Sequence, residues 1–143
     1  MKTMAVSTVC VVLLALVAPA RAQQPSDEAL VRQTVETYLH GLKFNDVASF
    51  KKSFLADAKL YFVKKDGSLG ALLQEQWYTG FAASAGKEEE GELSITSVDV
   101  TGTAASAKVR EVYPTSIYTD YVSLLKLGGE WKIVNKIFVA EKR

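Results

Sequence analysis

Cysteine and histidine are almost absent from this sequence, which contains one of each and three prolines. The one cysteine, Cys10, lies within an apolar stretch close to the first residue. The remainder of the chain therefore has no thiol for a disulfide, a nucleophile, a metal or a lipid anchor. His40 and scattered carboxylates do not have the spacing of metal ligands, so we expect no metal and no cofactor. Phosphate-binding glycine loops and the G-x-S-x-G nucleophile motif are also missing.

A large excess of charge of either sign is missing too, because 17 basic residues face 16 acidic ones. A nearly neutral protein lacks the basic surface that attracts nucleic acid or anionic lipid. Long apolar runs are also lacking, and the longest, over residues 9–17, is too short to cross a bilayer as a helix. We therefore expect neither a nucleic-acid partner nor a membrane span.

The first 22 residues have the pattern of a secretory signal peptide. Lys2 precedes the apolar run, and Ala20-Arg21-Ala22 provides an A-x-A cleavage site. We expect cleavage after Ala22, leaving a single mature domain over residues 23–143. This domain has no cysteine and no N-x-S/T sequon. These absences favour a bacterial periplasmic or secreted protein.

Helical patterns come first in the mature chain. Ser26 is a good N-cap, and apolar side chains then recur on one helical face as far as about Gly41. Asn45-Asp46 begins a second, short helix that buries three apolar side chains: Val47, Phe50 and Phe54. Residues 74–83 are predicted to form a third, short helix carrying aromatic side chains.

From Ala58 the apolar period becomes two, which is typical of strands. The first strand ends at Asp66-Gly67, a strong hairpin signal. Further strands are predicted over four ranges: 93–100, 104–113, 118–127 and 131–139. Helices followed by hairpin-connected strands predict an α+β fold, in which the helices pack on one face of a curved, mainly antiparallel sheet.

Two irregularities refine this sheet. The alternation changes phase near Ser97, which predicts a bulge there. The last strands are apolar on both faces, with Trp131, Ile133 and Ile137 expected on one side and Val134 and Phe138 on the other. A sheet with one face in water does not show this pattern. We therefore expect a homodimer through the outer sheet face.

Together these segments resemble the nuclear transport factor 2-like superfamily. In the first half of the mature chain, the similarity lies in residues 38–41, 45–46 and 54–60, with the sequences YLHG, ND and FLADAKL. Residues 119–126 and 131–138, TDYVSLLK and WKIVNKIF, resemble the branch labelled putative lumazine-binding. The resemblance implies a cone of three helices wrapped by a strongly bent sheet around an apolar pocket. It also implies frequent dimers, and both enzymes and non-enzymatic binders share this fold.

One segment departs from the family pattern. Relatives often have Phe-His-Pro-Asp-Ala where this chain has Phe54-Leu55-Ala56-Asp57-Ala58. The missing histidine means that no role of that residue can be transferred here. Asp57 remains, but an aspartate that leads into a strand is typically a turn residue.

The strand beginning at Ala104 contains the clearest candidate for chemistry. Ala105, Ala107 and Val109 alternate with polar residues, and the same alternation turns Glu111 and Tyr113 inward. A carboxylate in an apolar pocket has a raised pKa and can act as a general acid or base. The superfamily's isomerases use such a carboxylate with tyrosines that bind an oxyanion. Alternatively, a bulge near Pro114 turns Glu111 outward, or Glu111 pairs with a lysine at the rim.

Other residues are candidates for the same pocket. Asp120 is a second candidate base, and Asn135 interrupts an apolar alternation as either a pocket group or an internal hydrogen-bonding bridge. Large rings are frequent, and a few of them suffice to line a pocket for a flat ligand. The predicted ligand-binding residues are Tyr38, Tyr61, Trp77, Phe81, Tyr121 and Asn135.

Three functions are consistent with these patterns. The leading hypothesis is a non-catalytic exported protein that binds a small apolar or aromatic molecule. The second is a cofactor-free isomerase, dehydratase or cyclase that uses Glu111 or Asp120 as its base. The third is a protein-interaction module whose pocket is filled by side chains. An inward Glu111 with tyrosine neighbours would favour the second, and a filled interior the third.

Overall fold

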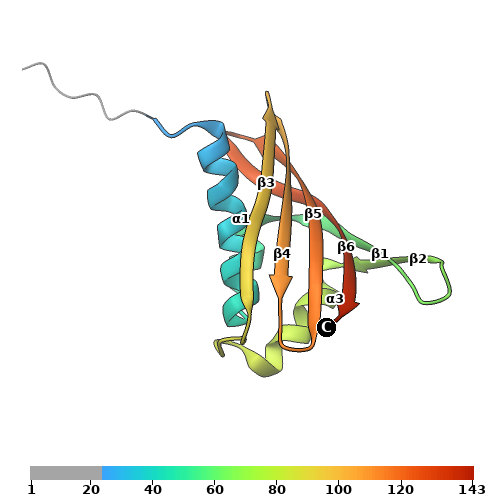
Figure 1. The fold of residues 1–143 in the computed structure, drawn as a ribbon. Coiled ribbons are helices and arrows are strands. Elements are labelled where there is room, and N and C mark those ends of the chain that lie inside the picture. The colour runs from blue at the N-terminus through green and yellow to red at the C-terminus, as the bar shows by residue number, and fades with distance from the viewer. Residues whose placement is uncertain (1–23) are drawn as a thin grey trace, which may run out of the picture.

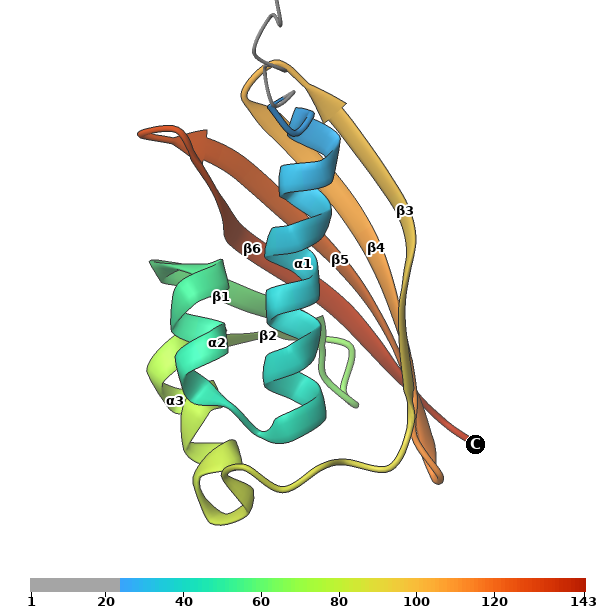
Figure 2. The same ribbon diagram turned by 90° about the vertical axis from the view of Figure 1, so that its left-hand side faces the viewer.

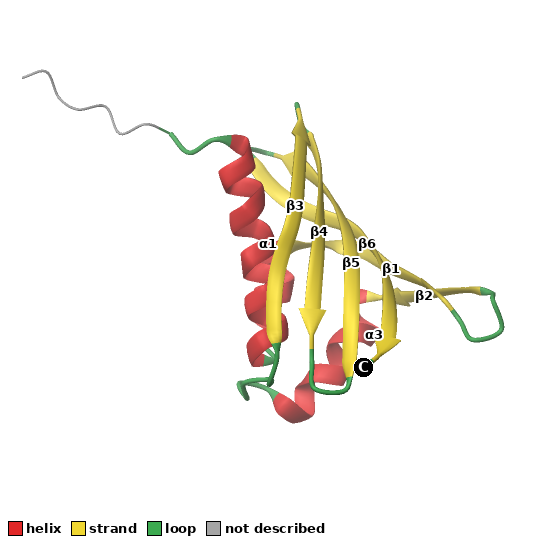
Figure 3. Cartoon of the chain, viewed as in Figure 1, coloured by secondary structure: helices red, strands yellow, loops and turns green. Residues whose placement is uncertain are grey.

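A computed structural model describes residues 24–143 of the chain (Figure 1). The expected signal peptide and its cleavage site after Ala22 lie outside this described part. Helices and strands follow in the order α1 (Asp27–Phe44), α2 (Val47–Ser53), β1 (Phe54–Val63), β2 (Leu69–Leu73), α3 (Gln74–Tyr78), a 3-10 helix (Thr79–Ser84), β3 (Glu92–Thr101), β4 (Ala104–Val112), β5 (Ser116–Leu127) and β6 (Glu130–Lys142). The predicted α+β class is confirmed (Figure 3).

The helix ends follow from local side-chain chemistry. Ser26 caps α1, because its hydroxyl oxygen accepts a hydrogen bond from the Ala29 N–H at 3.2 Å. Helix α1 continues past the predicted end at Gly41 and stops at Asn45, whose φ of 52° places it in the left-handed region. Asp46 then caps α2 by accepting from the Ala48 N–H at 3.0 Å.

The sheet has six strands in the order β2-β1-β6-β5-β4-β3. Every neighbouring pair is antiparallel except β1 and β6, which run parallel. The sheet curves around the helices, and α1 runs along its concave side (Figure 2). This arrangement is the predicted cone. Strand β2 pairs with β1 across the Asp66-Gly67 hairpin. The sequence pattern predicted this hairpin but not the bounds of its second strand.

The hydrophobic core lies between α1, α2 and the concave face of the sheet. Its most deeply buried members come from the helices and from β1, β4, β5 and β6: Val31, Val35, Tyr38, Phe50, Leu60, Val109, Val122, Leu124 and Ile133. Within residues 24–143, no helix combines the length and the apolar character needed to cross a membrane.

Two bulges determine which side chains point inward. The register of β3 and β4 shifts between Ile95 and Ser97, which confirms the predicted bulge. A second shift lies between β5 and β6. Asn135 pairs with Ser123 and Ile133 with Leu124, so Val134 is an extra residue.

The second bulge corrects the predicted faces of β6. Trp131 and Ile133 are buried, as expected, but beyond Val134 the alternation is reversed. Lys136 is therefore buried and Ile137 is 52% exposed on the outer face. The expectation that Ile137 shares a face with Trp131 was wrong, and so was the opposite face predicted for Phe138, which lines the pocket with Lys136. One extra residue moves every later side chain to the opposite face.

Candidate functional site

A pocket of about 440 Å³ lies between the end of α1, α3, the 3-10 helix and strands β4 to β6. Aromatic rings make up much of its wall. The lining residues are Leu42, Asn45, Trp77, Phe81, Glu89, Glu111, Tyr113, Ser116, Tyr118, Lys136 and Phe138. The interior of the cone is therefore not completely filled, and the filled pocket required by the interaction-module hypothesis is not observed.

Four buried polar side chains from four different elements meet beside this pocket. They are Tyr38 of α1, Glu111 of β4, Asp120 of β5 and Lys136 of β6. Their exposed fractions are 0, 3, 0 and 4%, respectively. Glu111 and Lys136 line the pocket, whereas Tyr38 and Asp120 are not among its lining residues. We call these four residues the buried polar cluster.

A continuous set of hydrogen bonds connects the cluster. Lys136 Nζ donates to Asp120 Oδ2 and to the Tyr38 hydroxyl oxygen, each at 2.9 Å. The Tyr38 hydroxyl donates to Asp120 Oδ2 and lies 3.3 Å from Glu111 Oε1. On the pocket side, the Tyr113 hydroxyl donates to Glu111 Oε2 at 3.1 Å. Both oxygens of Glu111 therefore have a tyrosine neighbour.

Burial changes the protonation of Glu111. Its pKa is raised to about 8, mainly by desolvation and also by the charge of Asp120, while Lys136 opposes the shift. Asp120 Oδ1 has no donor among residues 24–143, and a side-chain hydrogen bond with Asp120 also contributes to the raised pKa of Glu111. A proton on Glu111 can supply the missing donor. At neutral pH, Glu111 is therefore mainly an uncharged carboxylic acid.

The tyrosines of the site remain uncharged phenols. Burial, followed by the charges of Asp120 and Glu111, raises the pKa of Tyr38 well above its usual value. Burial and the neighbouring Glu111 likewise raise the pKa of Tyr113. Both hydroxyls therefore keep the hydrogens that they donate to Asp120 and Glu111.

Aromatic rings surround the charged end of Lys136. Its Nζ lies 5.3 Å from the centre of the Tyr38 ring, 5.0 Å from that of Trp77 and 4.8 Å from that of Phe138. Such ring faces attract a cation. Lys136 and Asp120 form an ion pair whose charges cancel, and a protonated Glu111 adds none.

Most of the sequence candidates from the helices and β4 are brought together here. Glu111 faces inward as the strand alternation predicted, and Trp77 and Phe81 line the pocket. Tyr38 and Asp120 belong to the cluster behind it. The roles proposed for these residues stay predictions, whereas their positions are now defined.

Three predicted pocket residues lie elsewhere, and their placement is corrected. Tyr61, Tyr121 and Asn135 belong to the outer face of the sheet, where Ile137 pairs with both tyrosines. Tyr121 and Asn135 line a shallow outer groove with Lys108 and Ser123. Asn135 was misplaced because of the extra residue Val134. Tyr61 and Tyr121 alternate with the inward-facing Leu60 and Val122, which turns both rings outward.

Lys136 is the functional residue that sequence analysis missed. Unbroken alternation through β6 gives this lysine an outward position, typical of a solvated charge. Only the bulge opposite Ser123 and Leu124 turns it inward. The available signal was the polar residue Asn135 in an apolar run, which marks the change of phase.

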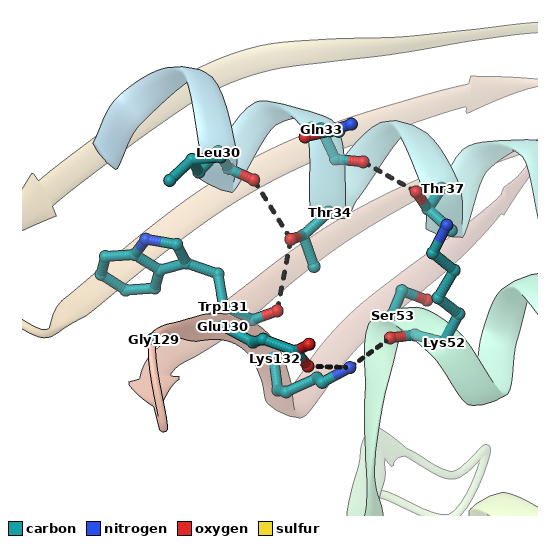
Figure 4. A pocket seen from close by; sticks show the side chains of 10 residues that line it. All are labelled: Leu30, Gln33, Thr34, Thr37, Lys52, Ser53, Gly129, Glu130, Trp131 and Lys132. Atoms are coloured by element: carbon teal, nitrogen blue, oxygen red, sulfur yellow. Dashed lines mark hydrogen bonds and ion pairs between the residues drawn. The ribbon is translucent and has the colours of Figure 1, made fainter. Parts of the chain in front are cut away.

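A second pocket, of about 290 Å³, lies between α1, the end of α2 and the start of β6 (Figure 4). Several of its polar groups already have partners. Thr34 Oγ1 lies 3.1 Å from the Leu30 carbonyl oxygen, and Lys132 Nζ donates to the Lys52 carbonyl oxygen at 2.9 Å and pairs with Glu130 at 3.1 Å. None of its acids or bases is fully buried, so the ring-lined pocket is the better candidate site.

Within the described part of the chain, no group of three or more His, Cys, Asp or Glu side chains is placed to hold a metal ion. The pocket and the cluster beside it offer aromatic rings, phenols, one ammonium group and the carboxyl groups of Glu89, Glu111 and Asp120. Such groups can bind an organic molecule, donate hydrogen bonds to it and exchange a proton with it.

The fold agrees with comparisons with known proteins. The chain belongs to the protein family described as putative lumazine-binding, which matches residues 26–139. This membership and the nuclear transport factor 2-like neighbours below support the resemblance found in the sequence. A comparison with curated proteins finds no match.

Several solved structures share the fold. A nuclear transport factor 2-like protein of unknown function from Shewanella baltica superposes with a TM-score of 0.71 and 25% identity, over 78% of this chain and 91% of that chain. A similar protein from Silicibacter pomeroyi superposes with a TM-score of 0.69 and 23% identity, over 79% of this chain and 94% of that chain. A third, from Methylobacillus flagellatus, superposes with a TM-score of 0.67 and 24% identity, over 78% of this chain and 89% of that chain. These structures support the cone fold.

Proposed function

We propose that this protein binds a small, ring-containing organic molecule in the pocket between Trp77, Phe138 and Glu111. The observation that carries the proposal is the meeting of aromatic walls with the buried polar cluster in one open cavity. Rings provide apolar area for a flat molecule, and Glu111 and Lys136 provide polar contacts that orient it. The family description, putative lumazine-binding, supports small-molecule binding without identifying the ligand.

The energetic cost of the cluster supports a function for it. Burying a charged pair removes two ions from water, and well-packed apolar residues at such positions often stabilise a protein equally well or better. Lys136 and Asp120 are therefore weak candidates for purely structural residues. A role in ligand binding explains why this buried ion pair is present.

Native mass spectrometry of the protein purified gently from its own host tests the proposal. We expect a stoichiometric small adduct. Ser116→Trp, which places a large ring in the pocket, should remove the adduct, because Ser116 lines this cavity. Gln33→Trp, in the pocket of Figure 4, is the matched control and should retain it. An adduct that persists in Ser116→Trp, or that only Gln33→Trp removes, would place the ligand elsewhere.

A second candidate function is cofactor-free acid–base catalysis, such as an isomerase, dehydratase or cyclase reaction. The specific observation in its favour is Glu111, whose pKa of about 8 suits proton transfer near neutral pH. Tyr113 and Tyr38 hold this carboxyl group in place. Asp120 is bound to Lys136 and Tyr38 behind it, which suits a positioning role better than that of a base.

Hydrogen–deuterium exchange next to a ketone tests the catalytic proposal. A panel of cyclic ketones incubated with the protein in deuterated water should exchange at carbon atoms beside the carbonyl, as followed by NMR. Glu111→Gln should abolish the exchange, since an amide cannot carry the proton. Exchange that is unchanged in Glu111→Gln would exclude Glu111 as the base.

We also propose that two copies pair through the outer face of the sheet. Tyr61, Ile137 and Tyr121 form a row across β1, β6 and β5. Ile137 and Tyr121 are 52% and 47% exposed, and Val139 and Leu125 add exposed apolar area on the same face. A second copy would remove this area from water.

The site of action is proposed to be the periplasm or the exterior of the cell. The support is the pattern Lys2, the apolar run 9–17 and the Ala20-Arg21-Ala22 cleavage site. Protein recovered from the native host should begin at Gln23. An intact N-terminus on protein confined to the cytoplasm would contradict export.

A further inference from the structure

We propose that Lys136 selects the ligand, and that the ligand is a flat ring molecule that presents a carbonyl or phenolic oxygen to its ammonium group. The inference rests on the proposed binding function and specifies which chemical group the pocket recognises. It starts from an ammonium hydrogen of Lys136 that has no acceptor within residues 24–143.

An ammonium group has three hydrogens to donate. Lys136 Nζ gives one to Asp120 Oδ2 and one to the Tyr38 hydroxyl oxygen. Among residues 24–143, it has no third hydrogen-bond acceptor, although the residue is only 4% exposed and lines the pocket. A buried donor that lacks an acceptor is costly, and an oxygen of a bound molecule would remove that cost.

Lys136 is the one positively charged donor in the pocket lining. Tyr113 already donates to Glu111 Oε2, and the amide nitrogen of Asn45 donates to the Lys87 carbonyl oxygen and to Glu89 Oε1. The other lining donors, on Trp77, Ser116 and Tyr118, are neutral, so Lys136 offers a ligand oxygen the strongest hydrogen bond. Trp77 and Phe138, whose rings lie close to Nζ, also line the cavity, so a flat molecule lying against them brings its edge near the ammonium group.

Charge narrows the class of ligand further. The cluster is neutral overall, because Asp120 balances Lys136, and Glu89 adds a carboxylate to the pocket lining. A multiply charged anion, such as a phosphate ester, would meet Glu89 without a second free cation in the pocket lining. A neutral ketone or a phenol fits this balance. A volume of about 440 Å³ suits a molecule of about two or three fused rings.

Two probes of nearly equal size test this inference: 1-indanone, which has a ring carbonyl, and 1-methylindane, which has a methyl group instead. Their dissociation constants are measured by isothermal titration calorimetry for the wild type and Lys136→Met. The quantity of interest is the ratio of the two affinities, because it cancels general effects of the substitution on the pocket.

We expect Lys136→Met to reduce the affinity ratio of indanone to methylindane by about tenfold or more, as for a hydrogen bond to a charged group. Lys132→Met is the control, since Lys132 belongs to the pocket of Figure 4, and should leave the ratio unchanged. Lys136→Met leaves Asp120 unpaired and could fail to fold for that reason. The double variant Lys136→Met/Asp120→Asn, which removes both charges, is then titrated in its place.

The outcomes separate this inference from the proposed function. A ratio that is the same in the wild type and the Lys136 variant overturns selection by Lys136 and leaves ring binding intact. That result would mean that the third hydrogen is satisfied by the faces of Trp77 and Phe138. Failure of both probes to bind any of the proteins contradicts the proposed function as well.

Discussion

Lys136 and Asp120 form a fully buried ion pair, with Nζ 2.9 Å from Oδ2, between neighbouring strands β6 and β5. The two residues face the same side only because Val134 is an extra residue in β6. A single bulge thus places a cation at the pocket, where it orders Tyr38 and faces Glu111. The arrangement links strand register directly to the chemistry of the site.

Breaking this ion pair should destabilise the protein strongly. Lys136→Met leaves Asp120 as an unpaired buried charge, and we expect a loss of about 3–5 kcal/mol in the free energy of unfolding. The double variant Lys136→Met/Asp120→Asn should recover part of this loss, because neither charge remains. Urea denaturation of the two variants and of Asp120→Asn measures the coupling. Simply additive effects would show that the pair does not act as a unit.

Stability should decrease as the pH rises from about 4.5 to about 8. Below this window, Glu111 is protonated in both the folded and the unfolded state. Within it, the unfolded chain loses the proton near the ordinary pKa of 4.5, while the folded protein keeps it up to about 8. The folded state thus binds more protons, and the free energy of unfolding falls with pH.

Glu111→Gln tests the source of this pH dependence. The variant should show a flatter stability profile between these two pH values, since its side chain does not titrate. Urea denaturation at several pH values measures the difference from the wild type. An identical slope in both proteins would assign the pH dependence to other groups.

The crossing of α1 and α2 should not tolerate a methyl group at Gly41. A Cβ atom added there would lie 2.4 Å from Cε1 of the buried Phe50 ring. Gly41→Ala should therefore cost about 1–3 kcal/mol, the usual range for overpacking a core. Gly80→Ala is the control, because no heavy atom lies within 4 Å of its added Cβ. Thermal unfolding measures the stability of both variants. Equal melting temperatures for Gly41→Ala and Gly80→Ala would contradict this packing.

The outer-face dimer should be sensitive to a single charge at its centre. Ile137→Glu places a carboxylate in the row of Tyr61 and Tyr121, and we expect it to convert a dimer to a monomer. Gln33→Glu introduces the same side chain on an exposed position of α1 and should leave the dimer intact. Light scattering coupled to size exclusion gives the mass. A monomeric wild type would refute the proposed pairing.

The sequence was sufficient for the fold and for part of the site. Helical spacing and the caps Ser26 and Asp46 defined α1 and α2, and the phase change near Ser97 predicted a real bulge. Glu111 was found because its strand alternates regularly from Ala105 to the pocket. Regular local patterns of this kind are determined by neighbours in the chain.

The remainder of the site depends on contacts between distant segments. Lys136 was missed and Asn135 misplaced, because the bulge at Val134 arises from the pairing of β6 with β5. The sequence pattern of β6 alone does not determine how its residues pair with those of β5. Likewise, the raised pKa of Glu111 depends on Asp120 and on burial by elements far apart in sequence. No local pattern contains this information.

The most direct test of the central claim is an NMR screen of the isotope-labelled 23–143 chain with a set of one- to three-ring fragments. The account predicts that binding fragments shift the backbone amide signals around Trp77, Glu111 and Lys136. Ser116→Trp should suppress these shifts. Fragments that perturb only residues around Thr34 and Lys132, or that perturb none of the protein's signals, would contradict a ligand site in the ring-lined pocket.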